Sequence, residues 1–201
     1  WSPSYITISD LFRRHSTLTV ADQILLVCRL YHVYVDITGY TGETLDKFYN
    51  WGVILLSDFD DIDKNMADAE KVFKIVTDLH ELDDISYLDD TQREALKHFF
   101  SAFSDNKPSE MREKFMRLWK RLYEMYTTFR ESLRNDGLAY EGMLYRDVAE
   151  DNGLDFGDDT YCFVGFNMLH AVEQRIFSRL RNMYGEEPGG RPHALFYWDY
   201  D

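Results

Sequence analysis

Apolar side chains recur at steps of three and four residues along most of the chain, which is the spacing of one face of an α-helix. The longest stripe predicts a helix over 108–133, with Pro108 in its first turn and Gly137 just past its end. Ser9 is expected to be the N-cap of the first helix. Further helices are predicted over 10–14, 21–35, 41–56, 67–79 and 91–103.

The last third of the chain has a different pattern. The aromatic run Tyr161–Phe166 and the apolar run Ala194–Trp198 are typical of buried strands, and a helical stripe over 168–183 separates them. A strand, a helix and a strand in this order predict two parallel strands joined by a right-handed crossover. The β-branched run Tyr5–Ile8 is also apolar on both faces, so we expect it to join the same sheet.

The sequence thus predicts a mainly α fold with a small parallel α/β layer. Residues 1–19 and 153–201 would form the layer, and residues 20–152 would form a helical domain inserted between its strands. Trp119 and Phe129 are expected in the core of that inserted domain. Because two strands rarely form a stable sheet alone, the expected sheet draws on both ends of the chain.

Composition and charge exclude several classes of protein. The 201 residues are 45% hydrophobic, which supports a folded core, and no uncharged apolar run approaches the roughly 20 residues of a membrane span. Cys28 and Cys162 are too few for a disulfide framework or a four-cysteine zinc site and fit a reducing cytoplasm. The net charge of −14 repels nucleic acid at long range, so any DNA contact has to be local. Because the chain starts at Trp1, we expect a piece of a longer protein.

Motifs for nucleotide, nucleophile and metal chemistry are missing or incomplete. The chain has no Gly-rich phosphate-binding loop followed by Lys and Ser or Thr, and no Gly-x-Ser-x-Gly elbow. An EF-hand starting at Asp61 would need a glycine and a glutamate that the sequence does not supply. His170 and Glu173 make only a single, reversed pair of the di-iron type. We therefore expect no catalytic residue, cofactor or metal ligand, and interpret the acidic run 58–63 as a solvated helix end.

One predicted helix offers a basic surface. A basic side of the helix over 108–133 and its end is formed by Arg112, Arg117, Lys120, Arg121, Arg130 and Arg134. This is the one surface that the sequence offers to a phosphate backbone or an acidic partner. The aromatic side chains of the same helix could stack on bases, but at helical spacing they are far more typical of a core.

Several segments together resemble a known family. They are ETLDKFYNWG (43–52), LLSDFDDIDK (55–64), YEGMLYR (140–146), FVGFN (163–167) and FYWDYD (196–201). The set resembles the helicase-like N-terminal region of AddB-type exonucleases of Bacteroidetes. In that family a degenerate, UvrD-like superfamily-one helicase motor precedes a PD-(D/E)XK nuclease domain. The partner subunit is an AddA-type helicase–nuclease, and the complex resects double-strand DNA breaks for recombination.

This resemblance implies roles for individual positions. Thr7 and Ser9 correspond to a strand-to-helix motif that contacts single-stranded DNA, in which Ser9 replaces a histidine. Val164 and Gly165 stand where an active Walker B strand carries the Asp that holds magnesium and the Glu that positions water. The resemblance therefore implies a remnant of a RecA-like motor domain with a helical insertion. It also implies that this fragment neither binds ATP tightly nor hydrolyses it.

Two functions follow as expectations. The first is a non-catalytic, helicase-like part of a cytoplasmic DNA-repair exonuclease, which contributes to DNA tracking or to assembly with an AddA-type subunit and meets DNA through the full complex. Its possible DNA contacts are Thr7, Ser9, Arg117, Lys120 and Arg121. The second is an acidic helical protein-interaction module with no nucleic-acid role. If Tyr5–Ile8 pairs with neither predicted strand, or if Phe163 lies in a helix, the motor-remnant interpretation loses its structural basis and the second function takes its place.

Overall fold

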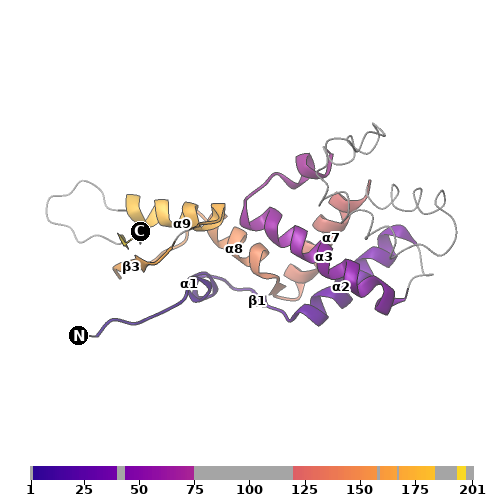
Figure 1. The fold of residues 1–201 in the computed structure, drawn as a ribbon, viewed down its shortest axis with the longest axis horizontal. Helices are drawn as coiled ribbons and strands as arrows, with labels where there is room; N and C mark the ends of the chain where they lie inside the picture. The colour runs from indigo at the N-terminus through magenta and orange to yellow at the C-terminus, as the bar shows by residue number, and fades with distance from the viewer. Residues whose placement is uncertain are drawn as a thin grey trace. The chain divides into compact units, whose positions relative to one another are not determined.

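The computed structural model in Figure 1 describes residues 2–39, 44–74, 120–157, 159–166, 168–183 and 194–197. These residues form a mainly helical structure with two small sheets, each of two parallel strands. The chain divides into two compact units. The first unit is formed by Trp1–Val20, Asp60–Ala67 and Gly137–Asp201, and the second unit by Ala21–Phe59 and Asp68–Asp136.

This division differs from the inserted domain that the sequence predicts. The second unit begins almost where the expected domain 20–152 begins, but residues 60–67 and 137–152 cluster with the first unit instead. A short parallel pairing explains part of the difference. Thr19–Val20 pairs with Leu138–Ala139. The first strand lies just before the second unit in the sequence and the other lies just after it, so the pairing joins the two ends of that unit. The sequence pattern did not predict either of these two-residue strands.

The first unit contains three helices and four strands among its described residues. They are α1 (Ile8–Arg14), β1 (Thr19–Val20), β2 (Leu138–Ala139), α8 (Glu141–Glu150), β3 (Tyr161–Val164), α9 (Ala171–Asn182) and β4 (Ala194–Tyr197). The last turn of α3 (Leu45–Lys64) also contributes residues to this unit.

The predicted order of strand, helix and strand at the end of the chain, with the two strands parallel, is confirmed. β3 and β4 are parallel, in a register that runs from Tyr161 opposite Ala194 to Val164 opposite Tyr197. Helix α9 covers one face of the pair, because the Phe177 ring lies 4.0 Å from that of Phe163 and 5.6 Å from that of Phe196.

The sequence also predicts that both faces of this sheet are buried. For the described residues this prediction is wrong. Val164 and Tyr197, which face each other in register, are 66% and 57% exposed. Phe163, which points toward α9, is the buried residue of β3. An apolar strand sequence therefore overstates how much of the strand is covered.

The predicted strand at Tyr5–Ile8 is wrong. Residues 5–7 form no strand, and α1 begins at Ile8. Thr7 rather than Ser9 is the N-cap: the Thr7 hydroxyl accepts from the Asp10 N–H, and the Asp10 carboxylate accepts from the Thr7 N–H at 3.0 Å. This reciprocal capping box satisfies backbone donors locally, so it prevails over the weak strand preference of a short β-branched run.

The capping box gives a first testable consequence. We expect Thr7→Ala to lower the free energy of unfolding by about 1 kcal/mol, because it removes the acceptor of the Asp10 N–H. Thr17→Ala is the matched control, because Thr17 is exposed and lies outside any described helix or strand. Urea denaturation followed by circular dichroism measures both. Equal midpoints for the two variants would contradict the cap assignment.

The second unit is helical in its described residues. Its elements are α2 (Gln23–Thr38), most of α3 (Leu45–Lys64), a helical stretch over 69–74 and α7 (Leu122–Asn135). The predicted helices over 21–35, 41–56 and 67–79 correspond to the first three, as far as the described residues reach. α2 ends at Gly39, whose φ of 64° is in the left-handed region that glycine adopts without strain.

The long predicted stripe is confirmed in its described half. Its residues on α7 are all buried: Leu122, Met125, Tyr126, Phe129 and Leu133. The rings of Tyr126 and Phe73 lie 5.2 and 6.0 Å from that of Phe59, at steep angles, so α3, α7 and the 69–74 stretch share one aromatic core. A continuous helix from 108 is wrong at residues 120 and 121, which form a turn ahead of α7.

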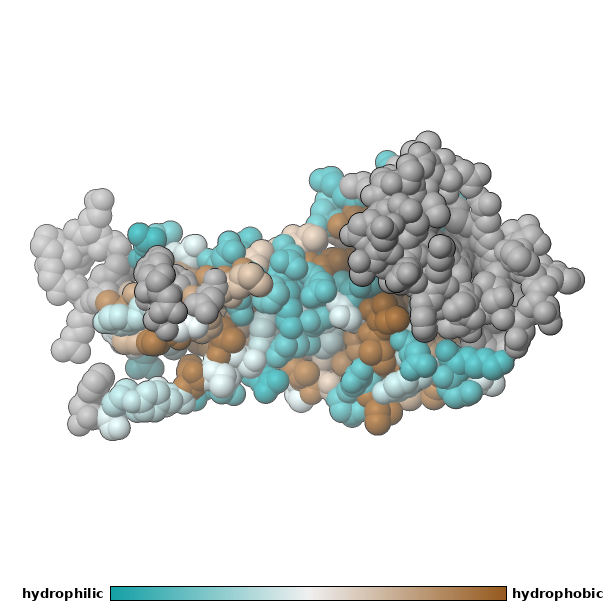
Figure 2. Space-filling model, viewed as in Figure 1, coloured by the Kyte–Doolittle hydropathy of each residue, from teal (hydrophilic) through white to brown (hydrophobic). Residues whose placement is uncertain are grey.

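Several predictions lie outside the described residues. They concern the helix over 91–103, the first half of the helix over 108–133 with Trp119, Arg112 and Arg117, and the end of the chain from Trp198. On the described part of the face shown in Figure 2, hydrophilic and hydrophobic residues are mixed. Among the described residues, no helix is long and apolar enough to cross a membrane.

Candidate functional site

The two N-terminal residues implied as DNA contacts are both engaged with acidic neighbours. The Thr7 hydroxyl donates to the Asp10 carboxylate at 2.7 Å. The Ser9 hydroxyl donates to Glu141 at 3.3 Å and accepts from the Tyr145 hydroxyl at 2.6 Å. A phosphate at either hydroxyl would meet a carboxylate, which repels it.

One basic candidate, Arg121 just ahead of α7, is also held by the protein itself. The Arg121 guanidinium pairs with Glu124 at 2.8 Å and donates to the Ile37 carbonyl. The hydrogen bond that Arg121 donates to Glu124 raises the pKa of Arg121 above its ordinary value, so this side chain stays charged. Lys120 is exposed, and Arg117 lies outside the described residues. Farther along α7, Arg130 stacks over the Tyr126 ring at 5.2 Å.

Val164 and Gly165 lie at the carboxyl end of β3, beside the end of β4. The Gly165 N–H donates to the Tyr197 carbonyl at 3.2 Å, and its φ of 79° suits glycine alone among common residues. This is the edge of a parallel sheet at which ligands usually bind. Neither residue carries a carboxylate, so these two positions supply no ligand for magnesium.

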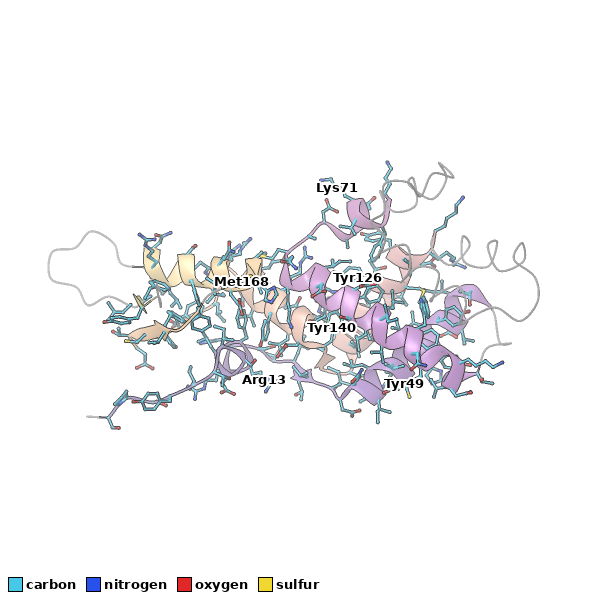
Figure 3. All side chains as sticks on the ribbon, in the orientation of Figure 1. Arg13, Tyr49, Lys71, Tyr126, Tyr140 and Met168 are labelled. Carbon is cyan, nitrogen blue, oxygen red and sulfur yellow. The ribbon has the colours of Figure 1, made fainter. Side chains whose placement is uncertain are left out.

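A group of charged side chains from three helices surrounds Lys64 in the first unit. The Lys64 ammonium contacts Asp60 at 2.8 Å and Glu141 at 2.9 Å, and it lies 5.7 Å above the centre of the Tyr145 ring. Its side chain is only 16% exposed. Arg13 of α1, labelled in Figure 3, approaches the same Glu141 at 3.9 Å. We call Ser9, Arg13, Asp60, Lys64, Glu141 and Tyr145 the Lys64 cluster.

The surroundings of Lys64, Glu141 and Tyr145 keep each of these side chains in one protonation state near neutral pH. Burial opposes the charge on Lys64, but hydrogen bonds and charge from Asp60 and Glu141 outweigh it and raise the pKa of Lys64. Burial likewise works against the Glu141 carboxylate, but Lys64, Tyr145 and Ser9 lower the pKa of Glu141 overall. Burial raises the pKa of Tyr145 to about 12. At neutral pH the lysine is therefore an ammonium and the tyrosine a phenol.

Asp63 forms a second, adjoining group of buried contacts. Its side chain is fully buried, accepts a hydrogen bond from the Tyr140 hydroxyl and pairs with Arg146 at 3.3 Å. Arg146 also donates to the Ala67 carbonyl and to Glu150, each at 2.9 Å. Figure 3 labels Tyr140 at the start of α8. The interpretation of residues 58–63 as a solvated helix end is therefore wrong for Asp63, which is neutralised inside the first unit.

The other residues that were considered as metal ligands also have different roles in the structure. The acidic run 58–63 is part of α3, so it cannot form a calcium-binding loop. The Glu173 carboxylate accepts from the His170 N–H at 2.8 Å, and the pair caps the start of α9. Among the described residues, no group of three or more His, Cys, Asp or Glu side chains is placed to hold a metal ion.

The Lys64 cluster has the chemistry of a structural clamp rather than of a catalytic site. A lysine with a raised pKa is a poor base and a poor nucleophile, and both of its carboxylates are already neutralised. Sequence reasoning missed the cluster because Glu141 lies 77 residues after Lys64. Only the four-residue spacing of Asp60 and Lys64 on one helix face was visible in advance.

Comparisons with known proteins add no assignment. No family model matches the chain, and neither a curated protein nor a solved structure matches it.

Proposed function

We propose that this chain is a non-catalytic assembly module, and that it serves as the helicase-like part of an AddB-type DNA-repair exonuclease. The observation that carries the non-catalytic, assembly role is the engagement of the candidate DNA contacts. The Thr7 and Ser9 hydroxyls bind carboxylates of this chain, and Arg121 binds Glu124 and a backbone carbonyl. Groups held in this way count against a role in following DNA, which leaves assembly with a partner subunit as the role that we propose.

The link to AddB-type proteins rests on the sequence resemblance, with limited support from the fold. The order β3, α9 and β4 with parallel strands is the arrangement that a motor-domain remnant requires. The positions of Val164 and Gly165 at the carboxyl end of β3 suit a Walker B strand that has lost its acids. In this proposal the partner is an AddA-type helicase–nuclease, and DNA is met through the full complex.

One observation favours the second function, a protein-interaction module with no nucleic-acid role. Tyr5–Ile8 pairs with no described strand, so the motor-domain interpretation loses the structural basis that it required and the sequence resemblance is its main support. Co-purification separates the two functions. An AddA-type subunit from the same genome, co-expressed with the parent protein of this chain, should co-elute with it. Elution of the two proteins apart would contradict the AddB-type assignment and leave the plain interaction module.

DNA binding by the isolated chain is expected to be weak. The net charge of −14 opposes phosphate approach, and few local contacts remain to offset it at physiological salt. Fluorescence anisotropy with a labelled single strand measures the affinity, and Arg121→Glu provides a matched variant. We expect no saturation in the micromolar range for either protein. Submicromolar binding that Arg121→Glu weakens would show that a local basic surface outweighs the net charge.

A further inference from the structure

The turn that follows α8 presents an asparagine next to a glycine. α8 ends at Glu150, Asp151 is its C-cap, and Asn152 and Gly153 form the turn after it. The Gly153 N–H donates to the Asp151 carboxylate at 2.8 Å, and the Leu154 N–H lies 3.5 Å from the Asp151 carbonyl. Residues 151–153 are all exposed, and no hydrogen bond of the described residues holds the Asn152 side chain.

This arrangement is suited to a spontaneous backbone reaction. An asparagine side-chain amide can be attacked by the backbone nitrogen of the next residue, and the reaction is fastest when that residue is glycine, since no side chain then obstructs the approach. Asn152 is the only asparagine in the sequence that a glycine follows. The turn lies outside helix and strand, so the backbone can adopt the geometry of attack once the exposed hydrogen bond to Asp151 opens.

We propose that Asn152 is a site of spontaneous deamidation. The Gly153 nitrogen loses its proton and forms a bond to the Asn152 side-chain carbonyl carbon. The bond from that carbon to the amide nitrogen breaks, and ammonia leaves with the proton, which closes a succinimide ring. Water then opens the ring at either carbonyl and yields aspartate or isoaspartate. The reaction needs only water and is faster at higher pH, because the attacking nitrogen must be deprotonated.

Other asparagines of the described residues are less suited to this reaction. The Asn65 side chain donates to the Asp61 carbonyl at 2.9 Å, and a methionine follows it. Asn135 and Asn182 are the last residues of α7 and α9, where helical backbone holds the following nitrogen away from the side chain. These positions provide internal references within the same protein.

The product would alter a loop that the first unit holds at two points. Arg179 donates to the Asp151 carbonyl at 2.6 Å and to the Leu154 carbonyl at 3.4 Å, on either side of Asn152. Isoaspartate lengthens the backbone between these two points by one methylene group, and either product adds a negative charge beside Asp151. We expect the isoaspartate form to melt at a lower temperature than Asn152→Asp, which adds the charge but keeps the backbone length.

Peptide mapping of the full chain tests the proposal. The protein is incubated in mildly alkaline buffer at physiological temperature, and mass spectrometry follows the replacement of an amide by a hydroxyl and the isoaspartate fragments. Asn152 should convert several-fold faster than Asn65 or Asn182. Gly153→Ala should reduce its rate to theirs, and this variant should fold, since its added Cβ would lie 3.4 Å from the nearest atom, Asp151 Oδ1. A rate at Asn152 equal to that at Asn65, or unchanged by Gly153→Ala, would overturn the proposal.

Discussion

Replacing Lys64 with methionine is expected to lower the free energy of unfolding by about 3 kcal/mol. The substitution keeps the length of the side chain but removes the cation that neutralises Asp60 and Glu141. Two carboxylates, 23% and 34% exposed, would then lose the cation they share, and only Glu141 would keep another basic group, Arg13, at 3.9 Å. The loss of one partner from such a group costs more than the pair contributes, because the remaining charges stay poorly solvated.

A matched control separates this effect from general loss of charge. Lys71 pairs with Asp68 at 3.0 Å, but its side chain is 78% exposed, so Lys71→Met should cost less than about 0.5 kcal/mol. Chemical denaturation of the three proteins measures the difference. Adding Glu141→Gln to Lys64→Met should recover part of the loss, because it removes one of the two repelling charges. Equal stability of the Lys64 and Lys71 variants would show that the Lys64 cluster contributes nothing beyond surface pairing.

The same cluster predicts how stability depends on pH. The pKa of Glu141 is lowered in the folded protein, so its contribution is present above the unfolded glutamate pKa of about 4.3 and is lost as the pH falls through the folded value. The pKa of Lys64 is raised, so its contribution is complete below about pH 10.4 and declines only above it. The stability difference between the native protein and Lys64→Met should therefore shrink as the pH falls below about 4.

Helices were predictable where a stripe of apolar residues is long. The stripe on α7 specifies a buried face through Met125 and Phe129, and the structure buries both. The run Tyr5–Ile8 is too short for such a signal, and the capping box between Thr7 and Asp10 decides its conformation instead. The pairing of β1 with β2 joins residues more than 100 positions apart through two residues each, which a local pattern cannot reveal.

The candidate site was harder to predict because charge patterns do not report burial. Asp58, Asp60 and Asp63 look alike in the sequence, yet Asp58 is exposed and Asp63 is fully buried against Arg146. What distinguishes them is the side of α3 on which α8 packs, and this depends on residues some 80 positions later in the chain. The sequence alone could place Asp60 and Lys64 on one helix face but could not supply Glu141.

Gly142 sets how closely α8 approaches the last turn of α3 within the first unit. Its N–H donates to the Asp60 carboxylate at 2.6 Å. A Cβ added at Gly142 would overlap the Asp60 carbonyl oxygen and would lie 2.9 Å from Asp60 Oδ1. The first of these atoms belongs to a helix backbone, which cannot rotate away as a side-chain end can. Any side chain at Gly142 must therefore push two helical segments apart and disturb the contacts of the neighbouring Glu141 with Lys64.

Gly142→Ala is accordingly expected to lower the free energy of unfolding by about 2 kcal/mol. This figure is the net effect of two opposing changes. The clash destabilises the protein, whereas alanine stabilises a helix relative to glycine by about 1 kcal/mol. Gly153→Ala, whose added Cβ would make only an ordinary contact, should change stability by less than about 0.5 kcal/mol. Urea denaturation of both variants beside the native protein provides the measurement. A gain in stability for Gly142→Ala would mean that helix propensity prevails and that α8 and α3 do not meet as closely as the structure places them.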